Sequence, residues 1–187
     1  MTSGQPRLDE RIGEVFLTAG EIAARVRELG AEITRDYAGR EPLLVGSLKA
    51  CLPFVTDLSM AIPIAHAIDF LELAGYGSAG SEMSQLGGHE RIRFLKDLDL
   101  EIGGRDVIVV DEVVDTGLTL HYLTRTLGLR GPESLVCATL FDRPYRRLLD
   151  DLPIRYVGFT VPDEFFAGYG FDLDERWRNL PNLHLVR

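Results

Sequence analysis

The chain has 187 residues, of which 45% are hydrophobic and 26% charged, a composition typical of a globular domain and not of a disordered or fibrous protein. Its formal net charge of −9 argues against a surface that binds nucleic acid in general. The sequence has no apolar run of about 18 residues, the length that a membrane span requires, and its first residues lack the apolar core of a signal peptide.

Helix and strand patterns alternate along the first half of the chain. Residues 1–14 are polar, and we expect them to lack regular structure. Thr18 and Glu21 form a capping box, the pattern that opens a helix, and Gly39 is a residue type that commonly follows a helix C-terminus. The patterns after this helix predict, in order, a strand at 43–46, a helix at 53–62 and a strand at 66–73.

The second half continues this alternation, with a predicted strand at 107–110, a helix at 118–129 and strands at 134–141 and 157–161. Strands separated by helices favour a doubly wound α/β fold with a mainly parallel sheet, here one domain over residues 1–187. Ligands of such folds bind beyond the carboxyl ends of the strands. We therefore expect a site where the turns at 47–50 and 111–119 converge.

Residues 105–120, RDVIVVDEVVDTGLTL, carry the most informative pattern in the chain. An apolar strand leads to two carboxylates, Asp111 and Glu112, and then to a tight turn that opens a helix. Successive backbone N–H groups in such a turn can bind an anion together with the helix N-terminus, and the hydroxyls of Thr116 and Thr119 can add donors. Carboxylates beside such a turn favour a sugar phosphate as the ligand. The alternative is an ordinary strand, turn and helix with solvated acids.

A long stretch in the middle of the chain, residues 75–89, has the composition of a loop. Its sequence, GYGSAGSEMSQLGGH, is too rich in glycine and serine to form a packed core. It is either a surface connection or a lid, extending to about residue 91, that closes over a reacting ligand and excludes water.

The segment from about residue 153 to the C-terminus holds the only Trp and many of the aromatic residues, which indicates a small sub-domain that packs on the sheet. Within it, Phe165 and Phe166 are adjacent, and adjacent side chains of an extended segment point in opposite directions. One ring is then available to a planar ligand. The alternative is that both rings simply pack.

With these stretches in view, the chain resembles the hypoxanthine/guanine phosphoribosyltransferases of the type I phosphoribosyltransferase family, from about Phe16 to the C-terminus. The run of four apolar residues, two acids, two apolar residues and Asp-Thr-Gly-x-Thr is similar to the family's signature for phosphoribosyl diphosphate (PRPP). VGSLKACLPFVTDL is similar to the family's pyrophosphate loop and following helix, and IDFLELAGYGS to the strand before its lid. FLKDLDLEIGGRDVIVV is similar to the segment that re-enters the core. YVGFTVPDEFFAGYGFDLDERWRNLP is similar to the family's base-binding hood, here about residues 153–187.

The resemblance implies an Mg²⁺-dependent enzyme of purine salvage. Such an enzyme transfers the ribose 5-phosphate of PRPP to hypoxanthine or guanine, giving IMP or GMP and pyrophosphate. Mg²⁺ suits the departing polyanion because it prefers carboxylate, hydroxyl and phosphate oxygens. The resemblance also implies a homodimer or homotetramer. Cys51 and Cys137 lie in apolar contexts typical of reduced cysteines, so we expect a cytoplasmic protein whose partners are small molecules, not nucleic acid or membrane.

The resemblance also assigns roles to individual residues in the central motif. Asp111 and Glu112 would hold the ribose hydroxyls, directly or through Mg²⁺. Asp115 would accept the proton from the reacting nitrogen of the purine. The 5-phosphate would lie in the turn formed by Asp115, Thr116, Gly117, Leu118 and Thr119.

Pyrophosphate would contact residues from three segments. The first holds Leu48 and Lys49, whose connecting peptide is cis in the family, and the other two supply the forked guanidinium groups of Arg147 and Arg178. Asp172 would hold a second Mg²⁺ with its waters next to the base. Taken singly, Lys49 is better explained as a solvated turn lysine, Asp172 as a helix cap and Arg178 as a surface residue. Their place in ordered motifs favours the site.

Three residues would contact the reacting base directly. Arg143 would donate to the 6-oxo group of the purine, Phe165 would stack on its ring, and the Phe166 backbone would contact its edge. Tyr76 would belong to the catalytic lid.

Several positions depart from the family pattern. The acidic pair, Asp111 and Glu112, is reversed, and Arg143 replaces a lysine, although arginine is not a conservative substitute for lysine at such a site. Gly75 replaces a serine, Ala50 and Leu118 are also atypical, and the lid is several residues longer.

These departures leave two alternative functions open. The chain could be a divergent phosphoribosyltransferase that acts on another base or carboxamide. It could instead be a regulator that senses PRPP or a nucleotide and binds RNA, since this fold also hosts such proteins. The net charge and the presence of Lys49, Asp115 and Arg178 argue against the regulator.

Overall fold

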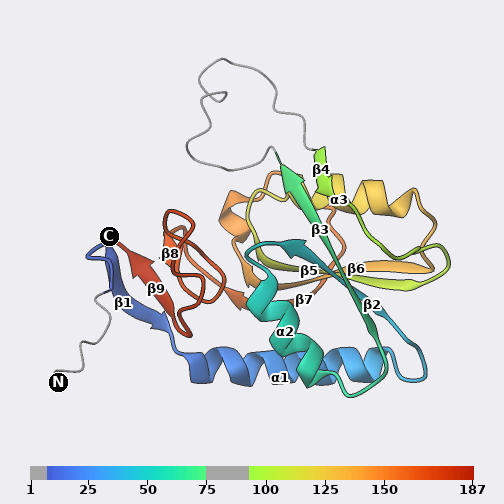
Figure 1. Cartoon of the computed structure of the whole chain (residues 1–187), viewed down its shortest axis with the longest axis horizontal. Coiled ribbons are helices and arrows are strands. Elements are labelled where there is room, and N and C mark those ends of the chain that lie inside the picture. Colours follow the sequence, from blue (N-terminus) through green and yellow to red (C-terminus); the bar gives the residue numbers. More distant parts are fainter. Residues whose placement is uncertain (1–7, 75–92) are drawn as a thin grey trace, which may run out of the picture.

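The computed structural model describes residues 8–74 and 93–187, which form a large sheet, a small sheet and flanking helices (Figure 1). The large sheet has the strand order β4-β3-β2-β5-β6-β7, and neighbouring strands are parallel except for the β3–β4 pair. Its strands are β2 (Leu43–Leu48), β3 (Ala67–Ala74), β4 (Arg93–Lys96), β5 (Asp106–Val114), β6 (Ser134–Asp142) and β7 (Ile154–Thr160). The predicted α/β fold with a mainly parallel sheet is confirmed.

Helices cover both faces of the large sheet. Helices α1 (Ala19–Asp36) and α2 (Leu52–Ala61) lie on one face, and α3 (Leu118–Gly128) lies on the other (Figure 1). Strand β5 packs alternate side chains into the two cores, with Ile108 and Val110 in the α1–α2 core and Val107 and Val109 in the α3 core. Burial on both faces explains why this strand is an unbroken apolar run.

The small antiparallel sheet has the order β1-β9-β8, with strands β1 (Ile12–Leu17), β9 (Leu183–Val186) and β8 (Phe166–Ala167) (Figure 1). The expectation that residues 1–14 lack regular structure is therefore wrong for residues 12–14. The reason is that β1 pairs with the end of the chain, a long-range partner that no local pattern signals. Residues 154–160, at the start of the segment predicted as a hood, form β7 of the large sheet.

Several predicted elements have different bounds in the structure. Strand β5 continues to Val114, so Asp111 and Glu112 belong to the strand and do not follow it. Strand β4 and a 3-10 helix at Pro144–Arg146 correspond to no predicted element.

The predicted lid at about residues 75–91, with Tyr76, lies outside the described residues. None of the helices within residues 8–74 and 93–187 is both long and apolar enough to cross a membrane.

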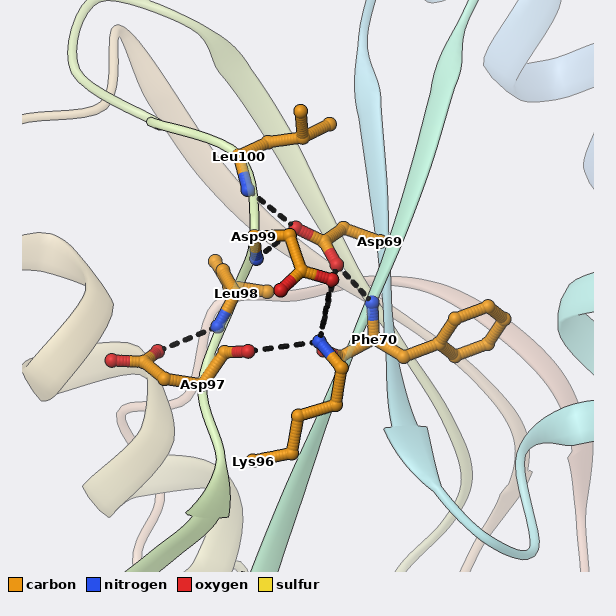
Figure 2. Close-up of polar contacts among 7 residues, drawn as sticks. All are labelled: Asp69, Phe70, Lys96, Asp97, Leu98, Asp99 and Leu100. Atoms are coloured by element: carbon orange, nitrogen blue, oxygen red, sulfur yellow. Dashed lines mark hydrogen bonds and ion pairs between the residues drawn. The ribbon is translucent and has the colours of Figure 1, made fainter.

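The side chain of Asp69 fixes the segment that follows β4, as Figure 2 shows. Asp69 lies in β3 and is only 5% exposed. Its carboxylate accepts backbone N–H groups from Phe70 (2.7 Å), Asp99 (2.8 Å) and Leu100 (2.9 Å). Lys96 lies 3.7 Å from the same carboxylate and donates to the Phe70 carbonyl oxygen at 2.9 Å. Although burial alone would raise the pKa of Asp69, these donors and the Lys96 charge lower it below its ordinary value.

We expect Asp69→Asn to lower the free energy of unfolding by about 1–3 kcal/mol at pH 7, because an amide NH₂ would face backbone donors that need an acceptor. The folded-state pKa of Asp69 is lowered. The stability that Asp69 contributes is therefore complete above its ordinary pKa of about 4 and is lost as the pH falls below it. Thermal unfolding at pH 7 and at about pH 3 measures both effects.

Asp99→Asn is the matched control, because the Asp99 carboxylate is 80% exposed and bonds only Lys96 within the described residues. We expect it to change stability by less than about 0.5 kcal/mol. Equal losses in the two variants, or a deficit in Asp69→Asn that persists unchanged at low pH, would contradict the role given to Asp69.

Candidate active site

A cavity of about 500 Å³ opens at the carboxyl edge of the large sheet. It lies where the turn after β2 meets the end of β5 and the turn that follows it, as the parallel topology predicts. The predicted site residues that line it are Leu48, Lys49, Asp111, Glu112, Asp115, Thr116, Gly117, Thr119 and Arg178. Three segments that are far apart in the sequence thus contribute to one cavity.

Asp111 and Glu112 place two carboxylates on the cavity wall. The Glu112 backbone N–H donates to Asp111 Oδ1 at 3.1 Å. Burial raises the pKa of Asp111 to about 6, and burial together with repulsion from Asp111 raises the pKa of Glu112 well above its ordinary value. Two neighbouring carboxylates that resist ionisation for these reasons are suited to a site that binds a cation.

The paired carboxylates fit Mg²⁺, which proteins commonly hold by one or two carboxylates while substrate phosphates supply further oxygens. Asp172, the third predicted metal ligand, already has partners on both oxygens. Its Oδ1 pairs with Arg178 at 2.7 Å, and its Oδ2 accepts the Glu175 backbone N–H at 2.9 Å. A metal contact by Asp172 therefore requires this arrangement to change, whereas Asp111 and Glu112 form no ion pair with a cationic side chain among the described residues.

The turn between β5 and α3 has the geometry of an anion site. Gly117 precedes the first residue of α3 and has φ +84°, a left-handed conformation that favours glycine. A Cβ at this position would lie 2.6 Å from Leu152 Cδ1 and 3.2 Å from Arg147 Cδ, so these two side chains would have to shift to make room for it. Thr116 and Thr119 line the cavity, while Leu118 is absent from its lining. The N-terminus of an 11-residue helix thus lies at the cavity with hydroxyl donors beside it.

Two cations, Lys49 and Arg178, face the cavity from distant parts of the sequence. Lys49 follows β2, and the Leu48–Lys49 peptide is cis, as the resemblance implies. Arg178 comes from the C-terminal segment and donates to the Gly170 carbonyl oxygen at 2.9 Å. Both cations contact one carboxylate, that of Glu175, at 3.0 Å from Lys49 and 3.3 Å from Arg178.

Asp115 is held by arginines on one side only. Its Oδ2 lies 3.0 Å from Arg146 and 3.8 Å from Arg143. Its Oδ1 is buried and has no hydrogen-bond partner among the described residues. One oxygen is therefore fixed in place while the other is free to accept a proton or a hydrogen bond from a ligand.

Arg143 and Arg147 do not line the cavity. Arg143 is 7% exposed, donates to the Glu164 carbonyl oxygen at 2.6 Å and lies over the Phe166 ring at 5.4 Å. Burial lowers its pKa from the ordinary value. Arg147 pairs instead with Asp142. Their predicted contacts with the base and with pyrophosphate stay predictions.

The two adjacent phenylalanines take opposite environments. Phe166 belongs to β8 and is 4% exposed, whereas Phe165 is 75% exposed. The alternative that both rings pack is wrong, because β8 continues the extended conformation that places neighbouring side chains on opposite sides. The Phe165 ring is thus accessible to a planar ligand.

Three charged residues near the site were not predicted from the sequence: Arg146, Asp163 and Glu175. Arg146 bridges Asp115 and Asp163, with its Nε 2.9 Å from Asp163 Oδ1. The arginine-rich run RPYRR after β6 was a usable signal for Arg146, since it follows the carboxyl end of a strand. No local signal marks Glu175, because its contacts depend on how the C-terminal segment folds back on Lys49.

The fold and this cavity together define an α/β protein with a cavity suited to a phosphorylated ligand at the carboxyl edge of its sheet. A family model described as the phosphoribosyl transferase domain matches residues 14–176. The hypoxanthine phosphoribosyltransferase of Salmonella typhimurium is 42% identical over 170 residues, which cover 90% of this chain and 92% of that protein. The hypoxanthine-guanine phosphoribosyltransferase of Mycobacterium tuberculosis is 44% identical over 175 residues, which cover 90% of this chain and 83% of that protein.

Solved structures of hypoxanthine/guanine phosphoribosyltransferases are also similar to this chain. A Bacillus anthracis hypoxanthine-guanine phosphoribosyltransferase has a TM-score of 0.85 at 36% identity and covers 95% of this chain and 98% of its own. The Trypanosoma cruzi hypoxanthine phosphoribosyltransferase in complex with the product IMP has a TM-score of 0.84 at 30% identity and covers 97% of this chain and 98% of its own. The chain belongs to the phosphoribosyltransferase family and, within it, to the hypoxanthine/guanine phosphoribosyltransferases.

Proposed function

We propose that the protein transfers the ribose 5-phosphate of PRPP to hypoxanthine or guanine and releases pyrophosphate, as an enzyme of purine salvage. The observation that supports this most is the placement of Asp111 and Glu112 beside the 115–119 turn in one cavity. The carboxylates suit a ribose, and the turn suits its 5-phosphate. The relatives' activities and the IMP complex of the Trypanosoma cruzi enzyme favour this reaction over another acceptor base or an RNA-binding role.

Different residues of the chain would bind the phosphates, accept the proton and hold the base. The backbone of the 115–119 turn holds the 5-phosphate, while Lys49 and Arg178 hold the pyrophosphate as it departs with growing negative charge. Asp115 Oδ1 accepts the proton of the purine nitrogen as the new bond to the ribose forms. The exposed Phe165 ring stacks on the base. Arg143 donates to its 6-oxo group after moving from the Glu164 carbonyl oxygen.

Mg²⁺ would be held by Asp111 and Glu112, and when bound it stabilises the negative charge of the departing pyrophosphate. Asp172 would contribute to a second Mg²⁺ only after its pairing with Arg178 loosens. Arg178 and the Glu175 backbone N–H satisfy the Asp172 carboxylate.

We also propose a cytoplasmic location and a homodimer or homotetramer. The free, buried thiols of Cys51 and Cys137 support the location, since such cysteines are typical of reducing compartments. Light scattering on the purified chain tests the assembly.

The proposed reaction predicts that PRPP and Mg²⁺ with hypoxanthine or guanine give IMP or GMP and one equivalent of pyrophosphate. Xanthine and adenine complete the panel, and chromatography of the nucleotides with a coupled pyrophosphate assay measures the products. Removing Mg²⁺ with EDTA is expected to abolish turnover, and added MgCl₂ is expected to restore it. If neither hypoxanthine nor guanine gave a nucleotide in the presence of Mg²⁺, the proposed reaction would be wrong.

A further inference from the structure

The carboxylate of Glu175 pairs with two of the three cations assigned to pyrophosphate, Lys49 and Arg178. Its Oε2 lies 3.0 Å from Lys49 Nζ, and its Oε1 lies 3.3 Å from a terminal nitrogen of Arg178. Lys49 and Arg178 both line the cavity, whereas Asp111 and Glu112 hold no cationic side chain within 4.0 Å among the described residues. Glu175 does not itself line the cavity, but its carboxylate pairs with two cations that the anionic part of the substrate is expected to contact.

The backbone around Glu175 has a conformation that is unfavourable for residues with side chains. Glu175 has φ +60°, in the left-handed region that side-chain-bearing residues rarely adopt, and its neighbours Asp174 and Trp177 have φ +55° and +71°. The Glu175 backbone N–H donates to Asp172 Oδ2, and Asp172 Oδ1 in turn pairs with Arg178. Strained residues of this kind persist where the surrounding structure determines them, often at functional sites.

The contact joins the two segments that would enclose pyrophosphate. Gly170 of the C-terminal segment approaches Ala50 so closely that a Cβ would lie 2.3 Å from the Ala50 carbonyl oxygen. Tyr169 donates to Asp57 of α2 at 2.6 Å. These contacts hold the C-terminal segment against the segment that carries Lys49 even without the Glu175 ion pair. The Glu175 carboxylate is therefore not needed to keep the two segments together.

We propose that Glu175 is an internal competitor for the pyrophosphate subsite, which pairs with Lys49 and Arg178 in the free enzyme and is displaced when the diphosphate of PRPP binds. This inference rests on the proposed function. Lys49 and Arg178 lower the pKa of Glu175, so the competing group is charged at neutral pH. Because Glu175 is 67% exposed at its side chain, it can swing into solvent when displaced. The same pairing would re-form as pyrophosphate leaves, which favours product release.

Isothermal titration calorimetry with inorganic pyrophosphate and excess MgCl₂ tests the proposal. Each exposed ion pair accounts for a modest factor, so Glu175→Gln is expected to bind pyrophosphate about two- to tenfold more tightly than the wild type. In the forward reaction, the KM for PRPP is expected to fall by a similar factor, while the KM for hypoxanthine stays unchanged. A merely structural role for Glu175 would not produce this split.

Asp174→Asn is the matched control, because Asp174 lies on the same strained segment but pairs with Arg11 at 2.7 Å. It removes the same charge and is expected to leave pyrophosphate affinity unchanged. Thermal unfolding establishes that both variants fold. If Glu175→Gln is unstable, Glu175→Asp serves instead, because its shorter side chain cannot span both cations and is expected to tighten binding by a smaller factor.

The outcomes separate this inference from the proposed function. If the wild type binds pyrophosphate and Glu175→Gln binds it equally or more weakly, Glu175 is not a competitor, while the pyrophosphate subsite stands. Equal tightening in Asp174→Asn would assign the effect to general charge and would also overturn the proposal. If neither the wild type nor Glu175→Gln binds pyrophosphate, both the subsite and the competitor are wrong.

Discussion

Asp115→Asn is expected to lower kcat by about 10²–10⁴-fold while PRPP binding stays close to that of the wild type, because the variant loses the proton acceptor and keeps the phosphate-binding turn. In the wild type, Asp115 Oδ2 is held by Arg146 at 3.0 Å, and Oδ1 is buried without a partner among the described residues. An asparagine would turn its amide oxygen toward Arg146, since an NH₂ group cannot face a guanidinium. Its NH₂ group would then replace Oδ1, where the purine needs an acceptor.

Single-turnover kinetics with saturating PRPP and hypoxanthine measure the chemical step in this variant, and equilibrium titration with PRPP measures binding. Asp163→Asn is the matched control, because Asp163 is the other carboxylate that contacts Arg146 among the described residues, at 2.9 Å. It loosens Arg146 without touching Asp115, and we expect less than a tenfold change in turnover. Full turnover by Asp115→Asn would refute the role of general base. Equal losses in both variants would assign the effect to the placement of Arg146.

The sheet and the phosphate turn were predictable from the sequence because their signals are local. The apolar run at 107–110 requires burial on both faces, and β5 has both. The pattern from Asp111 to Thr119 predicts carboxylates and an anion-binding turn in one place, and both line the cavity. Such patterns hold because the strand period and the turn chemistry depend on neighbouring residues alone.

The small sheet and the ion pairs around the cavity were not predictable in this way. Strand β1 forms because β9 lies beside it, and Ile12 pairs with Val186 at the other end of the chain. Arg147 was assigned to pyrophosphate by the resemblance, yet it pairs with Asp142. Long charged side chains have several partners within reach, and tertiary packing decides among them.

The conformation at Glu175 illustrates the same limit. A glutamate carries no signal for positive φ, which sequence patterns associate with glycine and asparagine. Its conformation follows from Asp172, Arg178 and Lys49, which meet it only in the folded chain. Of the cations that the family resemblance assigned to pyrophosphate, Lys49 and Arg178 line the cavity, but the resemblance did not identify the carboxylate that pairs with them.

Gly170→Ala is expected to damage both stability and substrate binding, because this glycine is where the C-terminal segment meets the segment after β2. Gly170 has φ +98°, and a Cβ would lie 2.3 Å from the Ala50 carbonyl oxygen, a backbone atom that cannot rotate away. The left-handed backbone costs an alanine about 1–2 kcal/mol, and overpacking adds about 1–3 kcal/mol. We therefore expect a loss of about 2–5 kcal/mol in the free energy of unfolding, measured by denaturant titration.

The same substitution should displace Arg178, because two hydrogen bonds join the two residues. The Arg178 side chain donates to the Gly170 carbonyl oxygen at 2.9 Å, and the Gly170 N–H donates to the Arg178 carbonyl oxygen at 3.0 Å. A displacement of about 1 Å at a substrate-positioning group can cost about 10²-fold in rate, so we expect kcat/KM for PRPP to fall by about 10–10²-fold. Gly39→Ala is the matched control: Gly39 has φ +76°, but an added Cβ has no neighbour within 4 Å among the described residues. We expect Gly39→Ala to lose only the stability that the left-handed backbone conformation costs an alanine, and to keep kcat/KM for PRPP unchanged. If Gly170→Ala were no less stable than Gly39→Ala and kept normal kcat/KM, the close contact with Ala50 would not position Arg178 and Lys49.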